Sequence, residues 1–259
     1  MMVTIVALAL LGALWATMLV TLEVGRRAAI RRRNKDPQER DADNTAIEAA
    51  VYGLLGLLLA FTITGAATRF DHRRDLTIEE TNAIGTAFHR LDLLPPNERV
   101  ILQDCFRRYM DSRIEFYKGI QDRPYALKKL SDQQSLERAI WDQALASAES
   151  PGASADATRL LLPALNTMFD IRTTRTGNLF MHPPIVIFIL LVTLALASSF
   201  LAGYEMAPDP QRNWLFAIIF TSILSISVYI VIDLEYPRYG LITNSTFDQL
   251  LVNLRAEMN

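Results

Sequence analysis

Four stretches of the sequence contain no Asp, Glu, Lys, Arg or His, and they decide what this chain can fold into. They are Met1–Leu22, Ala49–Thr68, Pro184–Tyr204 and Asn213–Ile232. Each is about as long as the roughly 20 residues that an α-helix needs to cross a hydrocarbon core about 30 Å thick. The sequence therefore predicts a multi-pass membrane protein with four transmembrane helices and excludes an ordinary soluble enzyme.

The charged segments between these stretches complete the predicted domain organisation. Residues 23–48 are predicted as a basic connecting loop, 69–183 as an inserted soluble domain, 205–212 as a short turn, and 233–259 as an amphipathic C-terminal tail. The positive charges follow the first apolar stretch, whereas a secretory signal peptide carries them before its apolar core. We therefore expect the first stretch to stay in the protein as a transmembrane helix.

The inserted domain has the periodicity of helices. No proline occurs from Gln38 to Leu94, which predicts one helix over 45–93, about 70 Å long, that carries the second transmembrane stretch into water. Beyond Pro95, apolar residues recur at spacings of three and four, and two further helices are predicted over 131–148 and 156–182, the latter kinked at Pro163. No segment alternates like a strand. The predicted fold class is all-α: four transmembrane helices with an antiparallel helical bundle inserted between the second and third spans.

The C-terminal tail shows a one-sided apolar stripe. Phe247, Leu250, Leu251 and Leu254 lie at helical spacing, and Ser245 with Asp248 resembles a capping box. We expect a short helix that lies on the membrane surface or against the bundle.

The composition excludes several classes of function. One cysteine, Cys105, rules out an intrachain disulfide framework and any cysteine-based metal cluster. The net charge is −2, and no domain of the chain is strongly basic, so no nucleic-acid partner is expected. His72, His89 and His182 lack any metal-ligand spacing. Without a phosphate loop or nucleophile elbow either, we expect no catalytic residues, no metal, no cofactor and no enzyme activity.

The second transmembrane stretch holds the candidate pore. Small residues Gly53, Gly56 and Gly65 recur along it and would let another helix approach closely. The alternative interpretation is that the same helix lines a pore, with an apolar constriction and a few hydroxyl groups beside it. The pore-lining candidates are Leu57, Phe61, Thr62 and Thr64. One helix can serve both purposes.

Polar residues in the two bundle helices nearest the membrane form a second candidate site. These residues are Glu79, Glu80, Asn82, Asn166, Asp170 and Arg175. A polar network that ties the two helices together is the main interpretation, and binding of a ligand or ion at that network is the alternative. At the membrane border, Glu48, Asp233 and Glu235 are predicted to anchor the helix ends or to pair with Arg69 or Arg238.

Several segments of the sequence resemble one family. They are Val51–Thr62, Glu79–Ala87, Leu162–Asn166 and Asp233–Ile242. Together they resemble the bestrophin-like domain family of bacterial membrane proteins, over roughly 45–254. The resemblance implies an oligomeric channel, with chloride or another small anion as its permeant ion. The acidic calcium-binding cluster of the animal bestrophins has no counterpart here, so calcium gating is not implied.

The resemblance and the charge pattern differ on orientation. The resemblance places the protein in the bacterial cytoplasmic (inner) membrane, and bestrophins have both termini in the cytoplasm. The basic cluster after the first span instead favours a cytoplasmic location for the C-terminal end of that span. The N-terminus and the bundle would then lie outside the cytoplasm. The charge pattern is the basis of our expectation, and the family topology is the alternative.

Two functions from different classes remain open. The first is an oligomeric anion channel, a homo-oligomer embedded in membrane lipid with the second span around its axis. The absence of any ionisable residue inside a span favours a passive channel over a proton-coupled transporter. The second is a membrane-anchored helical bundle that senses or scaffolds without transport.

Overall fold

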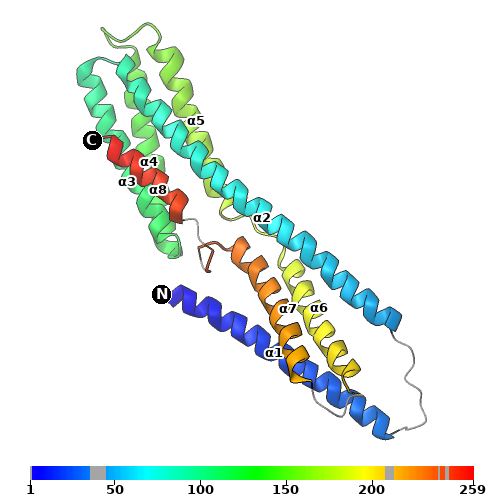
Figure 1. Cartoon of the computed structure of the whole chain (residues 1–259). Helices are drawn as coiled ribbons and strands as arrows, with labels where there is room; N and C mark the ends of the chain where they lie inside the picture. The colour runs from blue at the N-terminus through cyan, green and yellow to red at the C-terminus, as the bar shows by residue number, and fades with distance from the viewer. Residues whose placement is uncertain (1, 36–44, 208–212, 239, 243–244) are drawn as a thin grey trace. The chain divides into compact units, whose positions relative to one another are not determined.

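The computed structural model describes residues 2–35, 45–207, 213–238, 240–242 and 245–259, and these are helical with short turns between the helices (Figure 1). The helices are α1 (Met2–Lys35), α2 (Thr45–His89), α3 (Pro96–Gly119), α4 (Arg123–Ala148), α5 (Ala157–Asn178), α6 (Ile185–Glu205), α7 (Trp214–Glu235) and α8 (Ser245–Glu257), with a 3-10 turn η1 (Arg90–Leu93) after α2. No described residue lies in a strand. The predicted all-α fold class is confirmed.

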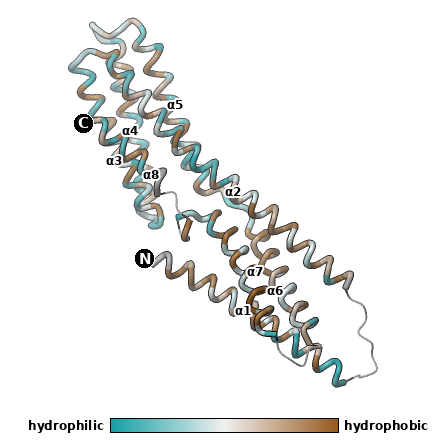
Figure 2. Tube along the Cα trace, viewed as in Figure 1, coloured by the Kyte–Doolittle hydropathy of each residue, from teal (hydrophilic) through white to brown (hydrophobic). Residues whose placement is uncertain are grey.

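Four helices are long and apolar enough to cross a membrane. They contain the segments Ile5–Lys35, Ala46–Leu93, Ile185–Glu205 and Trp214–Glu235. Figure 2 shows that α6 and α7 are hydrophobic along most of their length, whereas α2 changes from hydrophobic to hydrophilic after its first half. Because α2 has no proline or other helix breaker where it leaves the apolar stretch, its backbone continues as one helix.

The chain divides into two compact units. The membrane unit comprises 1–70 and 182–243, and the bundle unit comprises 71–181 and 244–259. In the membrane unit α1 packs against α6 and α7. A small apolar core joins these spans to α2, with Met18, Leu55, Leu191 and Val228 among its buried members.

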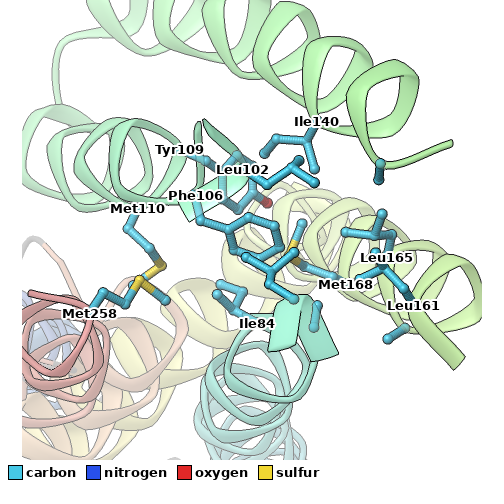
Figure 3. Close-up of a cluster of buried hydrophobic side chains, with 14 of the residues drawn as sticks. Ile84, Leu102, Phe106, Tyr109, Met110, Ile140, Leu161, Leu165, Met168 and Met258 are labelled. Carbon is cyan, nitrogen blue, oxygen red and sulfur yellow. The ribbon is translucent and has the colours of Figure 1, made fainter. Parts of the chain in front are cut away.

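The bundle unit has the larger core, built where α2, α3, α4, α5 and α8 meet. Figure 3 shows Ile84, Phe106, Ile140, Leu165 and neighbouring side chains pointing toward one another from these helices. All four are fully buried. The tail helix α8 packs on α3 and contributes Leu251 to this core, and Met258, directly after the helix, is buried there as well. Of the two expected places for the tail, the structure shows the one against the bundle.

Only part of the predicted C-terminal stripe belongs to the described residues. Nothing is described of the side chains of Ser245 and Phe247, so the capping box and the first residue of the apolar stripe lie outside the described residues. The later stripe residues are described: Leu251 is buried and Leu254 packs against the bundle core.

Three predicted boundaries differ from the structure. The segment 23–48 was predicted as a loop, but α1 continues as a helix to Lys35, because Arg and Ala favour helix and no proline occurs before Pro37. Helix α4 begins at Arg123 rather than residue 131, since the Asp122 carboxylate accepts the Tyr125 N–H as an N-cap. Helix α5 accommodates Pro163 and ends at Asn178, earlier than the predicted residue 182.

Candidate functional site

In the membrane unit, α2 has one face whose side chains stay exposed among the described residues. Leu57 is 54% exposed and Phe61 is 69% exposed, and Thr64 is exposed one turn further on. The spacing of four and then three residues places these side chains on one side of the helix. Thr62 is half-buried, and its hydroxyl donates to the Leu58 and Leu59 carbonyls at 2.8 and 3.1 Å.

The opposite face of α2 is packed. Leu55 is 3% exposed and Ala66 is fully buried. A Cβ placed at Gly53 or Gly56 would extend into open space, so neither glycine is needed for packing within the chain. At Gly65 the nearest atom to an added Cβ would be the guanidinium of Arg69 on the same helix. The span of α2 therefore has one face that packs on its own chain and one that does not.

The end of α7 in the membrane unit carries two buried carboxylates. The Asp233 carboxylate accepts the backbone N–H groups of Leu241 and Ile242, each at 2.9 Å, and so closes the turn that follows the helix. Glu235, fully buried, accepts a hydrogen bond from Arg69 Nε at 2.8 Å and lies 3.1 Å from His182 Nδ1. The predicted pairing of Glu235 with Arg69 is thus observed.

In the bundle unit, charged side chains of four helices and a glutamine of the fifth form a network around Glu80. Arg113 Nε and Arg175 Nη1 donate to the two Glu80 oxygens at 2.7 and 2.5 Å. Arg175 also pairs with Asp248 of α8 at 2.9 Å, and Arg113 donates to the Gln133 side chain of α4 at 2.9 Å. Glu80, Arg113 and Gln133 are fully buried. Every charge is therefore compensated by a partner from another helix.

The electrostatics of Glu80 follow from this arrangement. Burial by itself raises the pKa of the Glu80 carboxyl, but the charges of Arg113 and Arg175 and their hydrogen bonds outweigh it and hold the pKa below its usual range. Glu80 is thus ionised, and the two guanidinium groups are ionised with it. The Tyr117 ring lies 3.8 Å from the Arg175 guanidinium carbon and adds a cation–π contact.

A second ion pair extends the buried network. Arg172 of α5 donates to both carboxylate oxygens of Glu137 of α4. The hydroxyl of the buried Tyr109 lies 3.5 Å from the same carboxylate. Helices α3, α4 and α5 are therefore tied to one another by a second set of polar contacts, about one helical turn from the contacts of Arg113, Gln133 and Arg175.

The structure brings together only part of the predicted polar set. Glu80 and Arg175 form the centre of the network, whereas the side chains of Glu79, Asn82, Asn166 and Asp170 are exposed. Arg113 was not singled out from the sequence. The available signal was its place on the buried stripe of α3, four residues after Tyr109 and four before Tyr117.

The described residues contain no group of three His, Cys, Asp or Glu side chains placed to hold a metal ion. His72 and His89 are exposed, and Cys105 is partly buried against the bundle core.

Together, these features define a class: a multi-pass α-helical membrane protein whose second span continues into a polar, ion-paired bundle. The family profile of the Bestrophin-like domain matches residues 8–243, and the chain belongs to that family. A search of curated proteins finds no match.

Solved structures show the same fold. A variant of a bacterial bestrophin homologue from Klebsiella pneumoniae superposes with a TM-score of 0.70 at 13% identity, covering 96% of this chain and 98% of that one. A second structure of a bacterial bestrophin homologue from the same organism gives a TM-score of 0.65 at 14% identity, covering 92% and 97% of the two chains. At this level of identity the likeness shows the fold alone.

Proposed function

We propose that the protein is an oligomeric ion channel in which the span of α2 lines the pore. The observation that carries the proposal is the unpacked face of this helix, which bears Leu57, Phe61 and Thr64. Membership of the Bestrophin-like family supports it. The channel needs several copies of the chain, because one helix cannot enclose a water path.

The side chains on this face suit a constriction. Leu57 and Phe61 would form an apolar ring that controls wetting, and the hydroxyl of Thr64 would offer a polar contact next to it. Thr62 already uses its hydroxyl on its own backbone and would line the pore with its methyl side. Gly53 and Gly56 would allow a neighbouring copy to approach closely, because no described residue lies within 4 Å of a Cβ added at either position.

The family resemblance makes chloride or another small anion the permeant ion of this proposal. The span of α2 from Ala49 to Thr68 contains no Asp, Glu, Lys, Arg or His, which suits passive flow rather than coupling to protons.

Ion flux from liposomes that contain the purified protein tests the proposal, with chloride compared against potassium. Phe61→Ala and Leu57→Ala should change the flux because they alter the constriction. Leu215→Ala is the matched control: Leu215 is 66% exposed on α7, outside the proposed pore. Absence of flux with protein shown to be folded and inserted, or an equal effect of all three substitutions, would refute the channel.

The orientation belongs to the same proposal. The basic segment that follows the first span favours the cytoplasmic side for that end, which leaves the N-terminus and the bundle outside the inner membrane. Glu79→Cys in a Cys105→Ser background places one exposed thiol on the bundle. Its labelling in intact cells by a membrane-impermeant reagent would support this orientation. Labelling only after the cells are opened would place the bundle in the cytoplasm.

One observation favours the second candidate, a sensor or scaffold. The network around Glu80 connects all five helices of the bundle unit, including α2, whose backbone continues into the membrane unit. Such a bundle could pass a conformational change along α2 without any conduction. The flux measurement separates the two functions.

A further inference from the structure

Helix α1 continues beyond the end of its neighbour α6. The two helices run in the same direction in the membrane unit (Figure 1), and Gly203, near the end of α6, packs directly against the Leu22 backbone of α1. Helix α6 ends at Glu205, whereas α1 continues to Lys35. The last turns of α1 therefore carry the basic segment past the end of the apolar stretch of α6.

A groove lies beside this point, between α1, α6 and α7. It has a volume of about 390 Å³ and is lined mainly by apolar side chains, among them Leu22, Ala202, Phe216 and Phe220, together with the polar residues Glu205 and Asn213. Phe216 is 62% exposed, as expected for a side chain that faces lipid. The groove is thus of a size and character that suit a hydrocarbon chain.

A charged group lies at one end of the groove. A smaller adjoining cavity shares Leu22, Met206, Asn213 and Ala217 with the groove and is lined in addition by Leu19, Glu23, Arg26 and Trp214. The Arg26 side chain is 19% exposed and lies 4.0 Å from the Glu23 carboxylate, a distance too long for a hydrogen bond. Its guanidinium is therefore next to both the apolar groove and the polar surface.

The surrounding charges are mainly positive. Arg26 is followed on the same helix by Arg27, Arg31, Arg32, Arg33 and Lys35. Among the described residues, the acidic groups of this part of the membrane unit are Glu23, which pairs with Arg27 at 2.8 Å, and Glu48 and Glu205. Basic clusters directly beside a transmembrane helix attract negatively charged lipid headgroups.

We propose that this groove holds an acyl chain of an anionic phospholipid whose phosphate is bound by Arg26. The apolar walls would bind the chain of any phospholipid, and Arg26 would add the preference for a negative headgroup. This proposal does not depend on ion conduction, because the site lies on α1, α6 and α7 and not on the exposed face of α2.

Native mass spectrometry of the purified protein with phosphatidylglycerol or phosphatidylcholine tests the proposal. The wild-type protein should retain phosphatidylglycerol preferentially. Arg26→Gln should lower that preference roughly fivefold, the effect of one basic residue near a lipid headgroup. Arg27→Gln is the matched control, since Arg27 carries the same charge and pairs with the same Glu23 but does not line the groove. It should keep the preference.

Two further measurements separate the groove from a general attraction to charge. Ala202→Leu fills the groove and should reduce retention of both lipids, while the midpoint of thermal unfolding shows that the protein is folded. Inorganic phosphate alone should not raise that midpoint as phosphatidylglycerol does. Equal retention of the two lipids by the wild-type protein, equal effects of Arg26→Gln and Arg27→Gln, or full replacement of the lipid by phosphate would each overturn the proposal.

Discussion

Glu80 is the residue on which the charges of the bundle unit converge. It is fully buried, and it accepts hydrogen bonds from Arg113 of α3 and Arg175 of α5. Placing three charges in an apolar core is costly, and the cost is offset only while every partner stays in place. The neighbouring Glu79 is exposed, so two adjacent glutamates on α2 have opposite structural roles.

Removing the Glu80 charge should destabilise the protein strongly. Glu80→Gln leaves two buried guanidinium groups without their carboxylate and should cost about 3 kcal/mol or more. Thermal unfolding of the protein in detergent measures the change. Glu79→Gln is the matched control and should leave the unfolding midpoint unchanged. Similar midpoints for the two variants would mean that the ion pairs contribute little.

The same residue gives a prediction on pH. Because the pKa of Glu80 is lower in the folded chain than its ordinary value of 4.5, its ion pairs contribute to stability at neutral pH. That contribution is lost as the pH falls below about 4.5 and through the folded-state pKa. The difference in unfolding midpoint between the wild-type protein and Glu80→Gln should therefore shrink in acid. A difference that stays constant down to strongly acidic pH would contradict this assignment.

At the scale of elements, close contact between backbones holds α1 and α6 together. An added Cβ at Gly25 would overlap the Phe200 carbonyl, and one at Gly203 would overlap the Leu22 carbonyl. Two glycines on facing helices thus allow an approach that larger residues would prevent, as in other membrane helix pairs. Gly12 lies on the same helix α1, but a Cβ there would meet nothing.

Gly25→Ala should separate α1 from α6 and destabilise the membrane unit. The overlapping atom belongs to the backbone and cannot rotate away, so we expect a loss of about 1 to 3 kcal/mol, typical of overpacking. The midpoint of thermal unfolding in detergent measures it. Gly12→Ala adds the same methyl group where space is open and should cause no loss. If both substitutions behave alike, the close crossing is not important for stability.

At the scale of the whole molecule, the proposed channel requires several copies of the chain. The exposed face of α2 is where those copies would meet around the axis, and a Cβ added at Gly53 or Gly56 would meet no atom of the described part of the chain within 4 Å. A bulky side chain there would not disturb the single chain. It would disturb only contacts between chains.

Gly56→Phe should weaken the oligomer while leaving the fold of each chain intact. Light scattering of the detergent-solubilised protein measures the mass, and circular dichroism reports the helix content. Gly12→Phe serves as the control, because it adds the same ring into open space on α1, outside the proposed axis. An unchanged mass for Gly56→Phe would argue against α2 as the central helix.

The number of spans and the fold class could be predicted from the sequence because both depend on local properties. Length and lack of charge decide whether a segment enters a bilayer, and spacing of apolar residues decides helix against strand. Tertiary structure decided which side chains meet. Glu80, Arg113 and Arg175 are far apart along the chain, so no local pattern could pair them. It also decided that Leu57, Phe61 and Thr64 on one face of α2 stay exposed, because packing between distant segments sets which side chains of a helix are buried.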